Sequence, residues 1–154
     1  MSNTAKILCL ITLLCVINPI TIDAQNREVI SLERNWKFYK GVQDNPTTVN
    51  YDDSSWQTVT VPHDWAIAEP FLLDGNGNTG KLPWKAEGWY RKSLDIPKSL
   101  NGKKITLIFD GVMAFPKIYI NGQLAGQWDY GYNSFYVDIT DYLNYGEENI
   151  LTVY

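Results

Sequence analysis

Histidine and cysteine, which carry much of nucleophilic catalysis and metal binding, are nearly absent from this chain. Its 154 residues hold one histidine, His63, and two cysteines, Cys9 and Cys15. Both cysteines lie in an apolar N-terminal run, so the remainder of the chain has no cysteine for a disulfide or for a cysteine–histidine pair. The stability of that remainder must therefore come from packing rather than from cross-links.

Basic charge is scarce as well. The 13 lysines and arginines are outnumbered by 17 acidic residues, which gives a formal net charge of −4. No basic stripe is available to neutralise phosphates, so we expect neither a nucleic-acid partner nor an anionic membrane as partner. A neutral or polar ligand fits this composition better.

The N-terminus differs from the rest of the chain. A lysine precedes the run "ILCLITLLCVINPI", which is too short to span a bilayer and is followed by polar residues. This order predicts a signal peptide over residues 1–25, cleaved near Ala24, and export to the periplasm or the extracellular space. A buried helix or a membrane anchor is the alternative, which Pro19 and the lack of a basic stop-transfer cluster disfavour. The globular domain would then comprise residues 26–154.

No stretch of that domain shows a sustained helical period, and apolar residues alternate instead. Trp36 and Phe38 share one face of a predicted strand, as do Val59 and Val61 in "WQTVTVP". Another strand aligns Ile105, Leu107 and Phe109. Within "DITDYL" we expect one short helical turn capped by Thr140 or Asp141.

Asn121 and Gly122 stand between two apolar runs, a pattern that predicts a tight hairpin with both residues at positive φ. About seven such strands predict an all-β fold, an antiparallel jelly-roll β-sandwich of the galactose-binding-domain kind. The longest stretch without regular pattern runs from residue 62 to residue 86. A loop of that length in a compact domain is usually functional or covered by another element.

The long loop contains two misleading patterns. "GNGNTGK", residues 75–81, has phosphate-loop spacing, but Leu82 follows where a serine or threonine would meet magnesium. Asp74, Asn76 and Asn78 have the spacing of a calcium loop, but Lys85 stands where its glutamate belongs. We therefore expect no nucleotide, metal or cofactor here.

The residues of this chain also do not suggest a catalytic site. His63 and Asp64 are neighbours in extended chain, where adjacent side chains point to opposite sides, so they do not indicate a triad. Glycoside hydrolysis needs two carboxyl groups at a defined separation. Glu69 lies in the long loop and Glu87 directly follows it, but their positions do not indicate such a pair, and we assign no catalytic residue.

Three ordered motifs carry a family resemblance. "WQTVTVPHDW", "GWYRKSLDIP" and "FDGVMAFPKIYINGQLAGQWDYGYNSFYVDITDYLNYGEENILTV" together resemble the N-terminal sugar-binding jelly-roll domain of glycoside hydrolase family 2. That family includes β-galactosidases, β-mannosidases and β-glucuronidases. The "PHDW" and "GWYRK" forms are similar to exported β-galactosidases of gut-type bacteria.

The resemblance implies a division of labour. In such enzymes the jelly roll packs against an immunoglobulin-like sandwich and a (β/α)8 barrel, and the barrel supplies the two catalytic glutamates. This chain stops at Tyr154, in what resembles the last jelly-roll strand. It is therefore expected to be a fragment or truncated product, with the missing catalytic domains as partners, that hydrolyses nothing alone. A free-standing carbohydrate-binding module is the alternative.

The resemblance also implies that loops of this domain reach a sugar pocket, where carboxylates bind hydroxyls and aromatics pack on the sugar face. Asp64 is the first candidate for contact with a β-galactoside-like sugar, with His63 and Trp65 beside it. The structural alternative is that His63 bonds a backbone carbonyl while Trp65 plugs the end of the sandwich.

A second candidate group lies in "GQWDYGYNSF". Tyr130 falls where family members present an acidic or amide side chain, with Asp129 just before it. Trp128 and its neighbouring tyrosines either stack on a sugar or close a core edge. Trp84, in the long loop, is a third candidate for the entry to the cleft.

Overall fold

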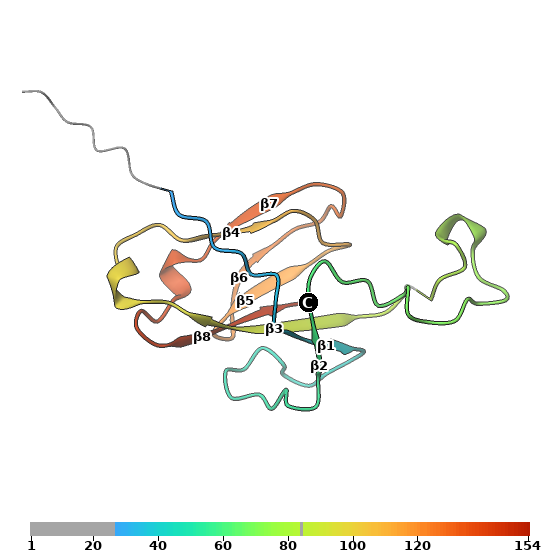
Figure 1. Ribbon diagram of the computed structural model, residues 1–154, viewed down its shortest axis with the longest axis horizontal. Helices are drawn as coiled ribbons and strands as arrows, with labels where there is room; N and C mark the ends of the chain where they lie inside the picture. The colour runs from blue at the N-terminus through green and yellow to red at the C-terminus, as the bar shows by residue number, and fades with distance from the viewer. Residues whose placement is uncertain (1–26, 84) are drawn as a thin grey trace, which may run out of the picture. The chain divides into compact units, whose positions relative to one another are not determined.

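The computed structural model describes residues 27–83 and 85–154 (Figure 1). The predicted signal peptide lies outside the described residues. By its contacts the chain divides into two units, residues 1–31 and 32–154, and every strand belongs to the second. The strands are β1 (Trp36–Lys40), β2 (Gln57–Val59), β3 (Gly88–Asp95), β4 (Thr106–Phe109), β5 (Lys117–Ile120), β6 (Gln123–Gln127), β7 (Phe135–Asp138) and β8 (Glu148–Val153). Three short 3-10 turns separate some of them: η1 (Gly77–Thr79), η2 (Lys98–Leu100) and η3 (Thr140–Tyr142).

The strands form two antiparallel sheets. One has six strands in the order β2-β1-β3-β8-β5-β6, and the other pairs β4 with β7. Figure 1 shows β4 and β7 as a separate layer beside the larger sheet. The predicted all-β antiparallel sandwich is confirmed, with eight strands in the described residues where about seven were expected.

The alternation of apolar residues fills the space between the sheets. Trp36 and Phe38 of β1 are buried while Lys37 between them is not, as a side-chain period of two requires. Leu107 of β4 is buried likewise. The core also contains Val59, Leu94, Ile118, Ile120, Phe135, Val137, Ile139, Leu143, Leu151 and Val153.

The Asn121–Gly122 hairpin forms as predicted. Asn121 has φ 51° and Gly122 has φ 83°, the left-handed region that a tight two-residue turn requires. Asn121 also joins the turn to β8, since its Nδ2 donates to Asn149 Oδ1 at 2.8 Å and its Oδ1 accepts from Ile150 N at 2.9 Å. Asn149 is fully buried, and its Nδ2 donates to two backbone carbonyls. The hairpin is therefore fixed by its side chain as well as by its backbone.

Two sequence predictions are wrong in detail. β2 ends at Val59, so Val61 lies beyond the strand, half-buried, with its N–H donating to Glu33 O at 2.8 Å. The predicted caps of η3 do not act as caps. Asp138 Oδ1, at the end of β7, instead accepts from Thr140 N at 3.1 Å and from Thr140 Oγ1 at 2.6 Å.

The strand register separates the sandwich into two ends. Lys40 pairs with Gly88, Tyr90 and Ile118 both pair with Val153, and Lys117 pairs with Gln127. The segments 66–87, 110–116 and 128–134 therefore all leave the strands at one end, which we call the loop end. The opposite end, the turn end, carries η2, η3 and the Asn121–Gly122 hairpin. In Figure 1 the loop end lies on the right, where the green segment extends away from the sheets.

Candidate functional site

The "VPHDW" segment follows β2 at the turn end, where Val59 pairs with Trp36, and runs under the larger sheet until Trp65 meets Gly88 near the loop end. The Val61–Pro62 peptide bond is cis. His63 Nδ1 lies 3.0 Å from the hydroxyl oxygen of Tyr90 on β3, and its ring meets Phe38 of β1 edge-on with centroids 4.6 Å apart. His63 thus bonds a side chain rather than the backbone carbonyl considered from the sequence.

Trp65 packs against the same strands. Its ring stacks on Phe38 at 5.7 Å with planes 13° apart, and a Cβ on Gly88 would come within 2.7 Å of its Cζ3 atom. Glycine is therefore required where β3 begins, because any side chain there would displace the indole. Trp65 Nε1 is buried and has no hydrogen-bond partner in the described part of the chain. Trp65 closes the loop end of the core, as the structural alternative predicted.

Asp64, between these two anchored rings, is exposed. Its Oδ1 accepts from Ala66 N at 2.8 Å, which closes a local turn. The charge of Asp64 also acts on the phenol of Tyr90. Burial, and secondly the Asp64 carboxylate, raises the pKa of Tyr90 to about 12. Asp64 is thus both a turn-forming residue and an exposed acceptor at the loop end.

The second candidate group lies in the segment after β6. Trp128 stacks on Phe135 at 5.4 Å and donates from Nε1 to Asn133 Oδ1 at 2.9 Å, so it closes a core edge. Tyr130 and Tyr132 stay in the open, 59% and 77% exposed, with their rings 5.6 Å apart. Asp129 is exposed between them and the tryptophan. The two tyrosines and Asp129 are available to a ligand, whereas Trp128 is mostly engaged.

The structure brings the two candidate groups to the same end of the sandwich, because Tyr90 and Ile118 both pair with Val153. Within the described residues no hydrogen bond or ring contact joins the group around His63 to the group around Tyr130. Trp84, the remaining candidate, lies outside the described residues.

Residues 67–87, which we call the arm, are fixed at their base. Glu69 Oε1 accepts from Lys40 Nζ at 2.5 Å, and Glu87 O accepts from Gly41 N at 2.8 Å. The tip closes on itself, with Leu72 N donating to Lys81 O at 2.8 Å. Among the described residues, no three histidine, cysteine, aspartate or glutamate side chains gather as a metal site would need, and no helix is long and apolar enough to cross a membrane.

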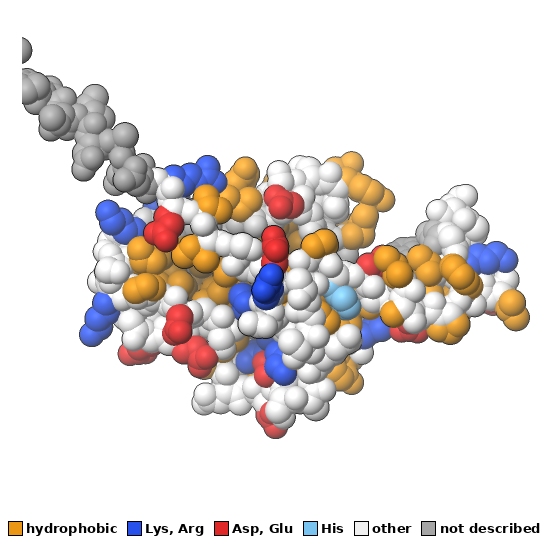
Figure 2. All heavy atoms as spheres, viewed as in Figure 1, with side chains coloured by type: hydrophobic (Ala, Val, Ile, Leu, Met, Phe, Trp, Pro, Cys, Tyr) orange, Lys and Arg blue, Asp and Glu red, His pale blue; other side chains and the backbone are white. Residues whose placement is uncertain are grey.

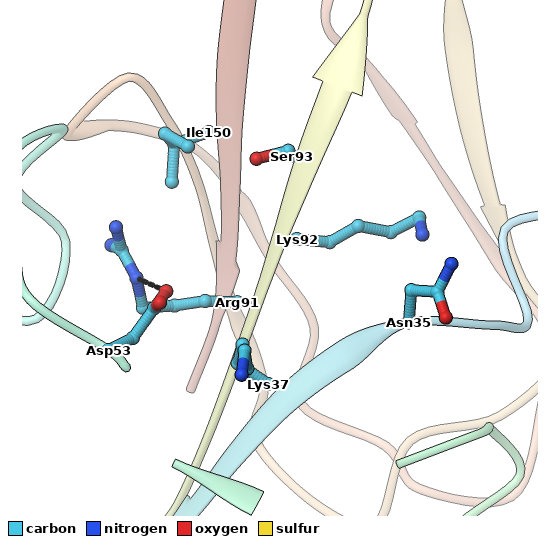
Figure 3. Close-up of a pocket in the computed structure, with 7 residues that line it drawn as sticks. All are labelled: Asn35, Lys37, Asp53, Arg91, Lys92, Ser93 and Ile150. Atoms are coloured by element: carbon cyan, nitrogen blue, oxygen red, sulfur yellow. Dashed lines mark hydrogen bonds and ion pairs between the residues drawn. The ribbon is translucent and has the colours of Figure 1, made fainter. Parts of the chain in front are cut away.

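Arg91 organises the outer face of the larger sheet, away from His63. Only 2% exposed, it pairs with Asp53 through a contact of 2.9 Å from Nε to Oδ2 and donates to the carbonyls of Pro46, Thr48 and Val49. The buried guanidinium therefore has a carboxylate partner and backbone acceptors. A depression of about 280 Å³ lies beside it. In Figure 3 Arg91 and Asp53 lie on one side of β3 and Lys92 and Asn35 on the other, so these groups do not converge on one ligand.

Sequence reasoning missed Tyr90 as a member of the site. Its partner His63 is 27 residues away, and neither residue type nor spacing announces the contact. The signal available was the alternation of β3, which places Tyr90 on the same face as the buried Leu94. Tyr90 is therefore a core-facing residue whose hydroxyl contacts His63 near the loop end.

The fold and its loop end define a jelly-roll-like sugar-binding domain, and comparison with known proteins supports this class. The model of the family described as "Glycosyl hydrolases family 2, sugar binding domain" matches residues 23–154. The chain is 34% identical over 134 residues to a β-glucuronidase of Formosa agariphila, which covers 86% of this chain and 14% of that protein. It is 36% identical over 129 residues to β-galactosidase BoGH2A of Bacteroides ovatus, with 82% and 15% covered.

Solved structures of family 2 enzymes support the same class of domain. A crystal structure of a β-glycosidase from Bacteroides vulgatus superposes with a TM-score of 0.75 at 35% identity, covering 82% of this chain and 17% of that one. The chain belongs to glycoside hydrolase family 2 and corresponds to its N-terminal sugar-binding domain. It spans about one seventh of the length of these two curated relatives.

Proposed function

We propose that this chain is the sugar-binding domain of an exported family 2 glycosidase and that Asp64, His63 and Trp65 border its sugar pocket. Asp129 and Tyr130 form a second part of that border, and Trp84 belongs to its entry. The relatives include both β-galactosidases and β-glucuronidases. A neutral β-galactoside is the better ligand here, because exposed Asp64 and Asp129 repel the carboxylate of a glucuronide.

The observation that carries the proposal is the state of Asp64. Its carboxylate is exposed, while one oxygen is held by Ala66 N at 2.8 Å, so the group is oriented without being buried. An ionised carboxylate is acceptor-only and binds hydroxyl donors through charge-assisted hydrogen bonds. A sugar hydroxyl meeting the second oxygen would find it pre-oriented, which reduces the entropy lost on binding.

We propose further that the chemistry belongs to a longer polypeptide, in which a (β/α)8 barrel supplies the two glutamates. The carboxylate of Glu69 accepts a hydrogen bond from Lys40, and Glu87 holds the arm base through its backbone carbonyl. The 154-residue chain should accordingly show no turnover of aryl β-galactosides above background, since unpositioned acids provide no acid/base contribution. Measurable hydrolysis that disappears in Glu69→Gln or Glu87→Gln would overturn this assignment.

The reading frame beyond Tyr154 distinguishes this proposal from a free-standing carbohydrate-binding module. Continuing β/α alternation with two spaced glutamates would support an enzyme domain. A stop codon directly after Tyr154 would support the binding module.

Asp64 is tested by paired substitutions. Asp64→Ala should weaken binding of methyl β-D-galactoside about ten- to hundredfold, because a charge-assisted hydrogen bond contributes roughly 1.5–3 kcal/mol. Asp64→Asn keeps an oxygen for Ala66 N and removes the charge, so it separates turn formation from sugar contact. NMR titration measures the dissociation constants and thermal melting reports the turn. If Asp64→Ala only lowers the melting temperature and leaves affinity intact, Asp64 is a turn residue and the proposed contact is wrong.

A further inference from the structure

The distance between His63 and Tyr90 does not show which of the two groups donates the hydrogen bond. The two atoms, His63 Nδ1 and the Tyr90 hydroxyl oxygen, are 3.0 Å apart, a normal hydrogen-bond length. Neutral imidazole carries one N–H donor and one bare acceptor nitrogen, and a phenol can donate or accept. Either Tyr90 donates to Nδ1, or Nδ1–H donates to the phenol oxygen.

The chemistry of the two groups favours donation by tyrosine. A bare imidazole nitrogen is a stronger base than a phenol oxygen, so the better acceptor faces the better donor when the hydroxyl points at the ring. Burial, and then the charge of Asp64, raises the pKa of Tyr90 to about 12, so the phenol keeps its hydrogen at neutral pH. Apart from His63, no described residue hydrogen-bonds the Tyr90 hydroxyl in the structure. Were the phenol to accept, its own hydrogen would have no protein partner among them.

Packing holds the imidazole in place for this bond. The ring meets Phe38 edge-on at 4.6 Å and Tyr90 at 5.9 Å with planes 73° apart. A flip of the ring about its Cβ–Cγ bond would put a carbon opposite the hydroxyl and leave a half-buried phenol without its acceptor.

We infer that Tyr90 is a positioning residue that donates to Nδ1 of His63 and thereby holds the ring hydrogen on Nε2. His63 then has an N–H donor, and Asp64, the next residue in the chain, has an exposed acceptor-only carboxylate. In Figure 2 the pale blue spheres of His63, the sole histidine of the chain, reach the surface. A sugar hydroxyl both donates and accepts, so a donor and an acceptor from the same segment suit a sugar with several hydroxyls. This last step rests on the proposed function, whereas the position of the hydrogen does not.

The single histidine makes a direct test possible. In the ¹⁵N-labelled 154-residue chain, long-range ¹H–¹⁵N spectra of the imidazole contain one spin system. We expect one protonated nitrogen assigned to Nε2 and one bare nitrogen assigned to Nδ1. In Tyr90→Phe, which keeps the ring and removes the hydroxyl, the two nitrogen shifts should move toward each other as both tautomers become populated.

Tyr136→Phe is the matched control. Tyr136 lies on β7 with 65% of its surface exposed, so removing its hydroxyl should leave the imidazole spectrum unchanged. Backbone amide spectra of both variants establish that the sandwich is intact. The inference is overturned if the wild-type chain carries its hydrogen on Nδ1, or if a folded Tyr90→Phe keeps the wild-type pattern. Should Tyr90→Phe not fold, the wild-type spectrum alone still decides which nitrogen is protonated.

Titration with methyl β-D-galactoside and methyl β-D-glucuronide separates this inference from the proposed function. A shift of the Nε2–H signal with either sugar, weakened at least severalfold in Tyr90→Phe, supports both. An Nε2–H tautomer that no sugar perturbs would leave Tyr90 a positioning residue and count against the sugar site. A sugar response unchanged in Tyr90→Phe would support the sugar site and contradict the positioning role.

Discussion

Tyr90 also links the loop end to alkaline stability. Its pKa is raised in the folded chain to about 12 by burial and by Asp64, against a usual value near 10. The folded state thus holds the proton more tightly than the unfolded state, and the stabilisation is complete below pH 10. As pH rises from about 10 to 12 the unfolded phenol ionises first, so stability is lost in that window. Urea unfolding measured at pH 9 and at pH 11 should show the decrease.

Tyr90→Phe should have a flatter stability profile between pH 9 and pH 11 than the wild-type chain. The exposed Tyr136 provides the comparison, since Tyr136→Phe removes a phenol that folding does not bury. An equally steep loss of stability in Tyr90→Phe would assign the alkaline sensitivity to other groups.

Individual contacts of the site divide into those that sequence could predict and those that it could not. The exposure of Asp64 follows from its place in a loop after Pro62. The bond from His63 to Tyr90 joins residues 27 apart, and the pair of Arg91 with Asp53 joins residues 38 apart. Such contacts depend on the register of whole strands, which no local pattern specifies.

Among the elements, those with a local cause were predicted. The Asn121–Gly122 hairpin follows from the two residues that accept positive φ, and β1 follows from alternating burial. The predicted end of β2 and the predicted cap of η3 were wrong because each depends on a hydrogen bond to another residue. Glu33 O takes the N–H of Val61, and Asp138 at the end of β7 takes the N–H of Thr140.

The arm should be removable without loss of the sandwich. Leu72 and Lys81 are already joined by a backbone hydrogen bond, so residues 73–80 can be replaced by Gly-Gly as a two-residue turn. Because the backbone hydrogen bonds of this tip join residues of the arm to one another, the free energy of unfolding should change by less than about 0.5 kcal/mol. Urea denaturation followed by tryptophan fluorescence measures it.

Replacing Pro46–Val49 with the same linker is the contrasting control. These residues supply three carbonyl acceptors to buried Arg91, and losing them leaves charged donors unpaired at a cost of about 3 kcal/mol or more. If the arm deletion destabilises the chain as much as this control, the tip supports the sandwich and our description of it is wrong.

At the scale of the whole molecule, exposed apolar side chains should make the chain self-associate. Phe71 and Leu73 of the arm are 70% and 96% exposed, and Phe115 and Tyr132 project from the loop end. A domain that exposes several such groups is expected to bury them against another surface. Sedimentation velocity over a hundredfold concentration range should show concentration-dependent association.

The double substitution Phe71→Ser and Leu73→Ser should reduce this association. Val42→Ser removes a similarly exposed side chain from another loop and should have little effect. A monomer at all concentrations in the wild-type chain would refute the expectation, as would equal effects of both variants.

The fold class could be predicted from the sequence because the strands of an antiparallel sandwich share a simple pattern. Apolar residues recur with a period of two and turns interrupt them. The order β2-β1-β3-β8-β5-β6 was not accessible, since strands of similar composition can pair in many orders. That order brings the base of the arm and the Tyr130 segment to one end, which the "VPHDW" segment reaches by running under β1 and β3.

The separation of the two ends offers a place to attach the domain to a surface. Asn101 follows η2 at the turn end, is exposed and has φ −60°, so an ordinary side chain fits there. No cysteine occurs after Cys15, which leaves Asn101→Cys as the only thiol of residues 27–154. A chain coupled to a chip or a bead through that thiol would hold its loop end outward, so immobilised glycans or sugars in solution would reach it without obstruction.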